Sequence, residues 1–298
     1  MADQSVTICI WPRLQGLGGP ASFASRLTAG LKARGVNVIN DPTAKADTML
    51  VIGGTARLDL VWRAKKRGVR IAQRLNGMNW VHKKKNFGLK YTIRAQYSNW
   101  ILATIRRSLA DRMIYQSQFS RTWWQTTYGS APDSGVVIYN GVDLQQFNPA
   151  GEQTLPQHFN RILLVEGRLG GGMEMGLENA VHLIQNLARG EPNQEWELMV
   201  AGEVPEEIKR RWEIQAAPAR INWAGVVKRD DIPKLDRSAH LLFSADLNAA
   251  CPNSVIEALA CGLPVIAYAT GSLPELLADS AGLVVPYGAN YWALERPD

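Results

Sequence analysis

Short apolar runs alternate with segments of helical spacing along almost the whole chain, and this alternation constrains the fold more than any other feature. The sequence predicts strands at residues 6–11, 36–39, 48–52, 69–73, 112–116, 136–139, 161–165, 196–201, 221–223, 241–244 and 264–268. Between them it predicts helices at 21–34, 58–67, 120–127, 177–188, 206–215, 230–238 and 254–260, with 79–109 helical in pieces. Strands that alternate with helices predict an α/β fold with parallel, doubly wound sheets.

A turn-rich stretch interrupts the alternation in the middle of the chain. Residues 140–157 contain Pro149, Gly151 and Pro156. A length of 298 residues suits two units of this kind. We therefore predict two Rossmann-like domains, at 1–150 and 151–298, that face each other across a cleft at the carboxyl ends of their strands.

Charge is divided unevenly between the two halves. Residues 1–150 hold 21 lysines and arginines against 7 acidic residues, a net +14, whereas residues 151–298 hold 12 against 20, a net −8. A positive half attracts anionic partners, such as a phosphorylated acceptor, an acidic lipid surface or a nucleic acid. The other interpretation is a solvated surface. Since no nucleic-acid-binding motif occurs, we expect no nucleic acid partner.

Other features of the sequence argue against a membrane-spanning, a secreted or a metal-binding protein. No run approaches the roughly 18–20 apolar residues that a membrane span needs. The start of the chain lacks the basic and apolar parts of a secretion signal, and the three cysteines lack metal-ligand spacing. The histidines share no metal spacing either. We expect a cytoplasmic protein, in contact at most with the inner face of the membrane, that contains no metal site.

The strongest local signal is the segment CPNSVIEALACGLPVI at residues 251–266. Asn253 or Ser254 is suited to cap a helix that begins there, and the first amides of that helix suit a diphosphate. Glu257, expected in the first turn, suits the two hydroxyls of a ribose. The alternative is a glutamate that only complements the helix dipole.

Three weaker segments are also candidates. Gly18 and Gly19 lie in a glycine-rich loop between the first strand and the first helix, where a phosphate approaches the backbone closely. Their spacing does not fit the dinucleotide fingerprint. Arg168 follows the first strand of the second half and suits a phosphate. The segment GSLPELL, residues 271–277, offers a glycine turn before a helix. Each of these also fits an ordinary turn or a surface arginine.

Together these segments resemble the GT-B glycosyltransferases of family 4. The resemblance rests on VIYNGVDLQQFNP (137–149), on EALACGLPVI (257–266) and on GSLPEL (271–276). It implies a C-terminal domain that binds a UDP-, GDP- or ADP-sugar, with no separate cofactor, and an N-terminal domain that binds the acceptor. It also implies a retaining, metal-independent transfer of a hexosyl group. The basic N-terminal half favours an anionic or lipid-linked acceptor, with peripheral membrane contact.

The resemblance also implies roles for individual residues. Glu257 would bind the donor ribose, and the amides beside Asn253, those of Ser254 and Val255, would lie near the diphosphate or sugar. Arg168 would neutralise the leaving phosphate, and Gly18 and Gly19 would let it approach the N-terminal loop. His82 lies near the position of a histidine that contacts the sugar in the family.

Three departures leave a second function open. Ala249 stands where the family has an acidic residue, no lysine follows Arg168 within residues 170–176, and the sequence ends at Asp298 without the family's long closing helices. Asp246, Asn248 or Lys228 are candidates to compensate. The first hypothesis is an active glycosyltransferase. The alternative is a catalytically weak or inactive relative that acts as a binding or scaffold module.

Overall fold

The chain folds into two compact units, Met1–Asn140 and Gly141–Asp298. The computed structural model describes residues 6–14, 16, 18–152, 154–170, 174–295 and 297. Residues 141–150, which the sequence assigns to the first domain, belong to the second unit. One reason is that the Arg237 guanidinium donates a hydrogen bond to the Asn148 carbonyl at 3.0 Å.

The first unit is built on a six-stranded sheet in which every neighbouring pair of strands is parallel. The strand order is β2-β1-β3-β4-β5-β6. The strands are β1 (Thr7–Trp11), β2 (Asn37–Ile39), β3 (Thr48–Ile52), β4 (Arg70–Leu75), β5 (Arg112–Tyr115) and β6 (Val136–Val137). The order reverses between β1 and β3, which is the point where ligands of open α/β sheets bind.

Helices cover both faces of this sheet because successive strand residues alternate between the faces. Cys9 packs with α2 (Leu58–Lys66) and the end of α3 (Leu89–Thr104), whereas Ile10 packs with α1 (Gly19–Lys32). Helix α4 (Gln118–Tyr128) anchors Trp124 against Leu75 and Tyr115. A short 3-10 helix, η1 (Val81–Lys83), precedes α3, and a π-helical turn, η2 (Ile105–Leu109), follows it.

The second unit has its own six-stranded parallel sheet, in the order β12-β11-β10-β7-β8-β9. Its strands are β7 (Asn160–Arg168), β8 (Trp196–Glu203), β9 (Arg220–Gly225), β10 (Leu241–Ser244), β11 (Val265–Tyr268) and β12 (Gly282–Val285). If β7 to β12 are numbered 1 to 6 and the sheet is read from β9 to β12, the order is 3-2-1-4-5-6, which is the arrangement of dinucleotide-binding sheets. The order reverses between β7 and β10.

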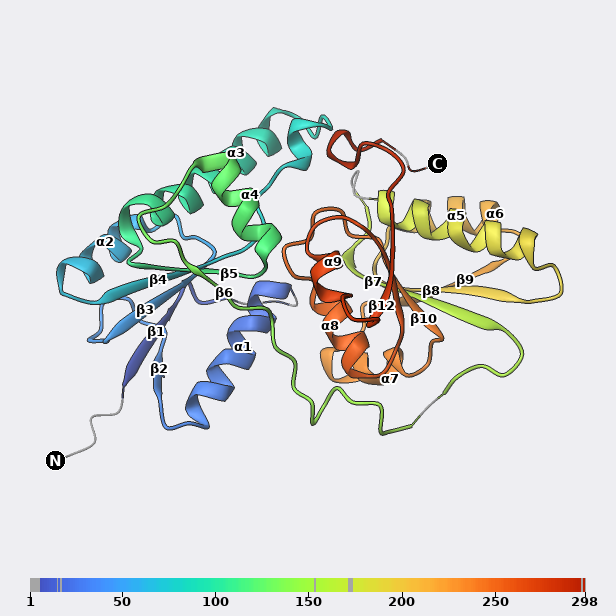
Figure 1. Cartoon of the computed structure of the whole chain (residues 1–298), viewed down its shortest axis with the longest axis horizontal. Helices are drawn as coiled ribbons and strands as arrows, with labels where there is room; N and C mark the ends of the chain where they lie inside the picture. The colour runs from blue at the N-terminus through green and yellow to red at the C-terminus, as the bar shows by residue number, and fades with distance from the viewer. Residues whose placement is uncertain are drawn as a thin grey trace. The chain divides into compact units, whose positions relative to one another are not determined.

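Two helical layers enclose the second sheet (Figure 1). Helices α5 (Met175–Gly190) and α6 (Glu206–Gln215) pack on one face through residues such as Ile184 and Trp212. Helix α8 (Asn253–Ala260) packs on the other face through Val255 and Ala258, together with α7 (Ile232–Asp236) and α9 (Leu273–Leu276). Two 3-10 turns, η3 (Arg229–Asp231) and η4 (Tyr291–Ala293), complete the unit.

The predicted alternation of strands and helices is confirmed, but several boundaries differ. The first helix begins at Gly19 rather than at residue 21, so that Gly18 is its N-cap and Pro20 lies in its first turn. The helix expected at 230–238 is divided into η3 and α7. Strand β12 was not predicted, although Val265–Tyr268 of β11 pairs with all of it.

Candidate functional site

The candidate site of the second unit lies where its sheet order reverses. Strands β7 and β10 are parallel neighbours, with Leu241 opposite Ile162 and Leu242 opposite Leu163. Parallel strands bring their carboxyl ends to one edge, so Glu166 to Arg168 of β7 and the loop 245–252 after β10 meet there. Helix α8 begins directly after this loop.

The start of α8 carries no side-chain cap. Its N-cap residue is Pro252, in an extended conformation at φ −71° and ψ 124°. The prediction that Asn253 or Ser254 caps the helix is therefore wrong, because both residues already lie inside the first turn. The first amides of an α-helix have no carbonyl partner within the helix and carry partial positive charge. The first turn of α8, which contains Asn253, Ser254 and Val255, therefore offers a favourable environment for an anion.

Glu257 is the fifth residue of α8 and so begins its second turn, not its first as predicted. Its side chain is buried beside Asp236 of α7, an element that packs on α8. Burial, followed by the negative charge of Glu257, raises the pKa of Asp236 to about 8. The Cys261 thiol, which is also hydrogen-bonded to Asp236, has its pKa raised to about 12 by burial. Asp236 is therefore neutral over most of the physiological range.

The loop after β10 is held against the loop after β11. Ser272 donates its amide hydrogen bond to the carbonyl of Ala249 at 2.9 Å, and Thr270 Oγ1 contacts the carbonyl of Asp246 at 3.4 Å. Gly271 makes this approach possible, since a Cβ there would lie 2.6 Å from the Ala249 nitrogen. Gly271 has φ +60°, which also favours glycine.

Asn248 is the most unusual polar residue of this loop. It has φ +60°, it is 4% exposed, and neither its Oδ1 nor its Nδ2 has a hydrogen-bond partner. Buried amides are nearly always hydrogen-bonded, because an unpaired one costs about 1–3 kcal/mol. The Ser272 hydroxyl, in the adjoining loop, is also buried without a partner. These loops therefore contain unused hydrogen-bonding capacity.

Two carboxyl groups, Glu166 of β7 and Asp246 of the loop after β10, lie at the same edge. Burial, and then the charge of Asp246, raises the pKa of Glu166 well above its ordinary value, and burial also raises the pKa of Asp246. Arg168, at the end of β7, is exposed and lies opposite Glu203 of β8. Residues 171–173, in which the sequence lacks the family's lysine, lie outside the described residues. The edge therefore combines a protonatable carboxyl pair with an exposed guanidinium.

Comparison with known proteins identifies the second unit. A sequence model of the family "Glycosyl transferases group 1" matches residues 160–294, which is nearly all of this unit. The second unit is therefore similar in sequence to the group 1 glycosyltransferases. The match includes the candidate edge, from Glu166 on β7 to Ser272 after β11.

Individual relatives are consistent with this similarity. The chain is 26% identical over 194 residues to the D-inositol 3-phosphate glycosyltransferase of Streptomyces bingchenggensis, covering 59% of this chain and 42% of that protein. It is 28% identical over 138 residues to the 2-deoxystreptamine glucosyltransferase of Streptomyces kanamyceticus, covering 44% of this chain and 33% of that protein. The matched regions thus span less than half the length of these curated relatives.

Solved structures show the same fold. Anabaena HepE, solved in complex with UDP and glucose, has a TM-score of 0.64 and 15% sequence identity. The alignment covers 94% of this chain and 86% of that chain. The two parallel sheets flanked by helices confirm the predicted α/β class and the predicted GT-B fold.

The first unit contains the remaining predicted residues. Gly18 caps α1 in an extended conformation and Gly19 is the first residue of that helix. His82 is buried in η1, and neither ring nitrogen has a hydrogen-bond partner. Burial, with a smaller contribution from Lys83, lowers the pKa of His82. An imidazole in these surroundings is neutral at pH 7 and can donate or accept one hydrogen bond.

A buried polar cluster at the carboxyl ends of β4 and β5 was not predicted from the sequence. Arg74 is almost fully buried; its guanidinium contacts Asn76 and Asn140 and lies 3.6 Å from the centre of the Phe23 ring. Gln116 donates to the Leu75 carbonyl at 2.9 Å. The RLNG segment at 74–77 was the available signal, but an arginine at a strand end is usually exposed.

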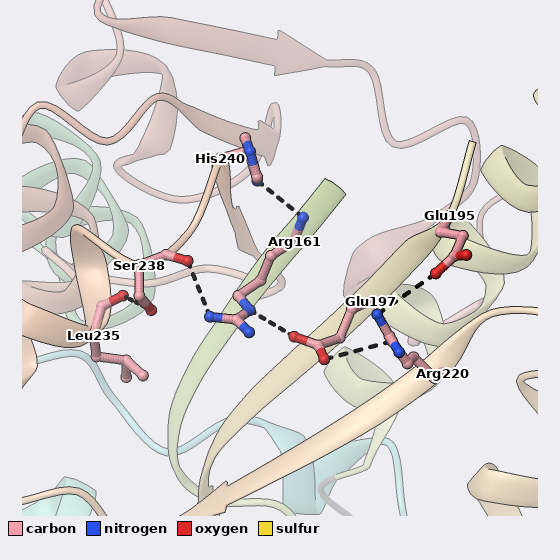
Figure 2. A network of polar contacts seen from close by, with 7 residues as sticks. All are labelled: Arg161, Glu195, Glu197, Arg220, Leu235, Ser238 and His240. Atoms are coloured by element: carbon pink, nitrogen blue, oxygen red, sulfur yellow. Dashed lines mark hydrogen bonds and ion pairs between the residues drawn. The ribbon is translucent and has the colours of Figure 1, made fainter. Parts of the chain in front are cut away.

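A second polar network lies at the opposite edge of the second sheet, near the amino-terminal ends of its strands (Figure 2). Arg161 of β7 forms a buried ion pair with Glu197 of β8 at 2.5 Å and also donates to the Ser238 carbonyl at 3.1 Å. Arg220 of β9, which is exposed, lies 3.7 Å from Glu197. Because ligands bind at the carboxyl ends of such strands, this network is assigned to stability.

The described part of the chain shows neither a metal-binding cluster nor a membrane-spanning helix. It holds no group of three or more histidine, cysteine, aspartate or glutamate side chains placed to bind a metal ion. None of its helices has the length and apolar character needed to cross a bilayer.

Proposed function

We propose that the protein transfers a hexosyl group from a nucleotide sugar to an acceptor, with the donor bound at the carboxyl edge of the second unit. One observation carries the proposal: the uncapped start of α8 and the carboxylate of Glu257 one turn later occur in the unit that matches the group 1 family. The UDP and glucose in the HepE complex support this donor class. UDP-, GDP- and ADP-sugars are the candidates.

The proposed roles follow from the chemistry of each group. The first-turn amides of α8, at Asn253, Ser254 and Val255, bind the donor diphosphate. Glu257 accepts hydrogen bonds from the two ribose hydroxyls, and neutral Asp236 behind it adds no second negative charge below pH 8. Arg168 is exposed at the end of β7 and stabilises the diphosphate as it leaves.

The sugar requires a partner other than the acidic residue of the family, since residue 249 is alanine. Asn248 is the residue best suited to that role, because its amide is buried and unpartnered in the same loop. A neutral amide donates one hydrogen bond and accepts another, which suits a pair of sugar hydroxyls. We propose that Asn248 replaces the usual carboxylate.

The first unit supplies the acceptor side in this proposal. Gly18 and Gly19 let a phosphate approach the backbone, and His82 contacts the sugar or the acceptor as a neutral imidazole.

During transfer, the bond between the anomeric carbon and the diphosphate oxygen breaks. A bond to the acceptor oxygen forms on the same face of the sugar, and the proton of the acceptor hydroxyl passes to the departing diphosphate oxygen. We expect this step to need no metal ion, which activity in excess chelator tests.

The acceptor is proposed to be anionic or lipid-linked, and the protein to contact the membrane only peripherally. The support is the net charge of +14 over residues 1–150. An inactive binding module is the second candidate, and Ala249 is the observation that favours it.

A thermal-shift and turnover experiment tests the proposal. UDP-glucose, GDP-mannose and ADP-glucose are screened against the parent and Glu257→Ala, with Glu275→Ala, from the neighbouring α9, as the control. A ligand at about 100 times its Kd adds about 2.7 kcal/mol of stability. We expect one nucleotide class to stabilise the parent and the control but not Glu257→Ala. Equal shifts in all three proteins would contradict the ribose role, and binding without hydrolysis or transfer would favour the module.

A further inference from the structure

Helix α3 has an apolar outer surface. Leu89 is 75% exposed, Ile93 59%, Tyr97 52% and Trp100 54%. These residues recur at helical spacing, and with about 100° per residue they occupy a sector about 80° wide. The opposite side of the helix, with Ala95, Asn99 and Leu102, is buried. We call the four exposed residues the α3 ridge.

Exposure of this kind is unusual on a surface helix. A helix that covers a sheet normally turns charged residues to solvent and apolar residues to the core. Single exposed apolar residues are common, but a continuous apolar row indicates an interaction surface. The Tyr97 and Trp100 rings stack with their centres 5.8 Å apart, which makes the row broader than four isolated side chains.

Positive charge borders the ridge. Lys90 and Arg94 occupy the next sector of the helix, and Lys83 and Lys84 precede it; all four are exposed. The sequence from 60 to 110 contains 13 lysines and arginines and no aspartate or glutamate. An apolar row with aromatic side chains and a basic border is the composition of helices that lie in the interface of anionic membranes.

We propose that the α3 ridge binds the surface of a membrane that contains anionic lipids. Leu89 and Ile93 enter the outer part of the acyl layer, and Tyr97 and Trp100 lie at the level of the headgroups. The flanking lysines and arginines contact the lipid phosphates, with their aliphatic parts along the apolar row. A protein partner is less well matched, because it would need a large acidic surface around an apolar groove.

This inference specifies the membrane contact included in the proposed function, but its test is independent of the donor site. Flotation with vesicles is measured without nucleotide, using phosphatidylcholine alone and phosphatidylcholine mixed with phosphatidylglycerol. The ridge variant is Ile93→Glu with Trp100→Glu. The charge variant is Lys83→Gln with Lys84→Gln and Lys90→Gln. The control is Ile214→Glu on α6, since Ile214 is an apolar residue of the second unit that is also highly exposed.

The parent and the control are expected to float with the mixed vesicles and not with phosphatidylcholine alone. Both variants should bind about tenfold more weakly or worse, and binding of the parent should fall as salt is raised. Melting temperatures verify that each variant is folded, and the charge variant retains the whole ridge if the ridge variant fails to fold. Equal flotation of parent and both variants would overturn the proposal. So would a parent that binds neither vesicle, or one that forms a dimer through the ridge.

Discussion

Ser272 donates its amide hydrogen bond to the carbonyl of Ala249, and this 2.9 Å contact joins the loops that follow two neighbouring strands, β11 and β10. The contact fixes the backbone directly after Asn248 and Gly271, and the contact of Thr270 Oγ1 with the Asp246 carbonyl lies on the other side of both residues. In the proposed function it therefore positions the sugar-binding loop before any donor arrives, which reduces the ordering that binding requires.

Replacing Gly271 by alanine is expected to separate these loops. The added Cβ would lie within 2.7 Å of both the nitrogen and the carbonyl oxygen of Ala249, at a backbone φ of +60°. Backbone atoms cannot move aside as a flexible side chain does, so we expect a loss of about 1–3 kcal/mol in unfolding free energy. Urea denaturation measures it. Gly190→Ala, whose Cβ meets nothing within 4 Å, is the control and should change little.

Asn248→Gly is expected to separate stability from donor recognition. Glycine accepts the φ of +60° without strain, and removal of an amide that has no partner eliminates its desolvation cost. The unfolding free energy should therefore stay equal or rise. Calorimetry with UDP and with a UDP-sugar should show unchanged UDP affinity and loss of the additional affinity from the sugar. If the variant retained the additional affinity from the sugar, Asn248 would not be the sugar-binding residue that we propose.

Asp236→Asn is expected to change the pH dependence of stability. The folded pKa of about 8 lies above the ordinary 3.8, so the folded protein retains a proton that the unfolded chain has released. The corresponding stabilisation is complete below pH ~4 and is lost as the pH rises to ~8. Asparagine cannot ionise, so the variant does not lose this stabilisation. Between pH ~4 and ~8 its unfolding free energy should therefore rise relative to that of the parent, by on the order of a few kcal/mol. Denaturation at several pH values measures the difference.

The matched control for that experiment is the exposed Asp231→Asn, which should follow the parent at every pH. If the donor site is as proposed, donor affinity of the parent should also weaken above pH 8, when ionised Asp236 faces Glu257. A constant difference between parent and Asp236→Asn from pH 4 to 9 would show that Asp236 ionises normally.

Glu197→Ala is expected to destabilise the second unit without changing donor affinity. It leaves the mostly buried guanidinium of Arg161 without its carboxylate; because breaking a fully buried pair costs about 3–5 kcal/mol, we expect a loss of about 2–4 kcal/mol in unfolding free energy. Glu195→Ala removes an exposed carboxylate 3.7 Å from Arg220 and should cost less than about 1 kcal/mol. Denaturation and donor titration of both variants test the assignment, and a weakened donor affinity in either one would contradict it.

Much of the fold was predictable because it depends on local patterns. Apolar runs with helical segments between them specify parallel strands, and each predicted strand occurs within a few residues of its position. β12 was missed because Gly282–Val285 follows a turn-rich stretch, and its pairing with β11 is a tertiary contact. The π-helical turn at Ile105–Leu109 has no distinctive composition and was likewise not predicted.

The site was less predictable, because its main features depend on packing. The sequence located α8 but suggested the wrong cap, since proline at 252 takes the extended cap position and moves Asn253 into the helix. The sequence predicted a helix at 230–238 but gave Asp236 no role, because only the packing of α7 on α8 buries this residue. Asn248 is buried without partners in a loop whose backbone packs closely against Gly271, a tertiary contact that no local sequence pattern reveals.

The division of the chain at Asn140 has a consequence for evolution. Each unit has its own sheet and its own apolar core, so mutations that remodel one half leave the packing of the other intact. In the proposed function, Glu257 and the first amides of α8, which bind the nucleotide part of the donor, belong to the second half. Descendants of such a gene can therefore acquire new acceptors mainly through change or recombination in the first half, while they retain these nucleotide-binding residues.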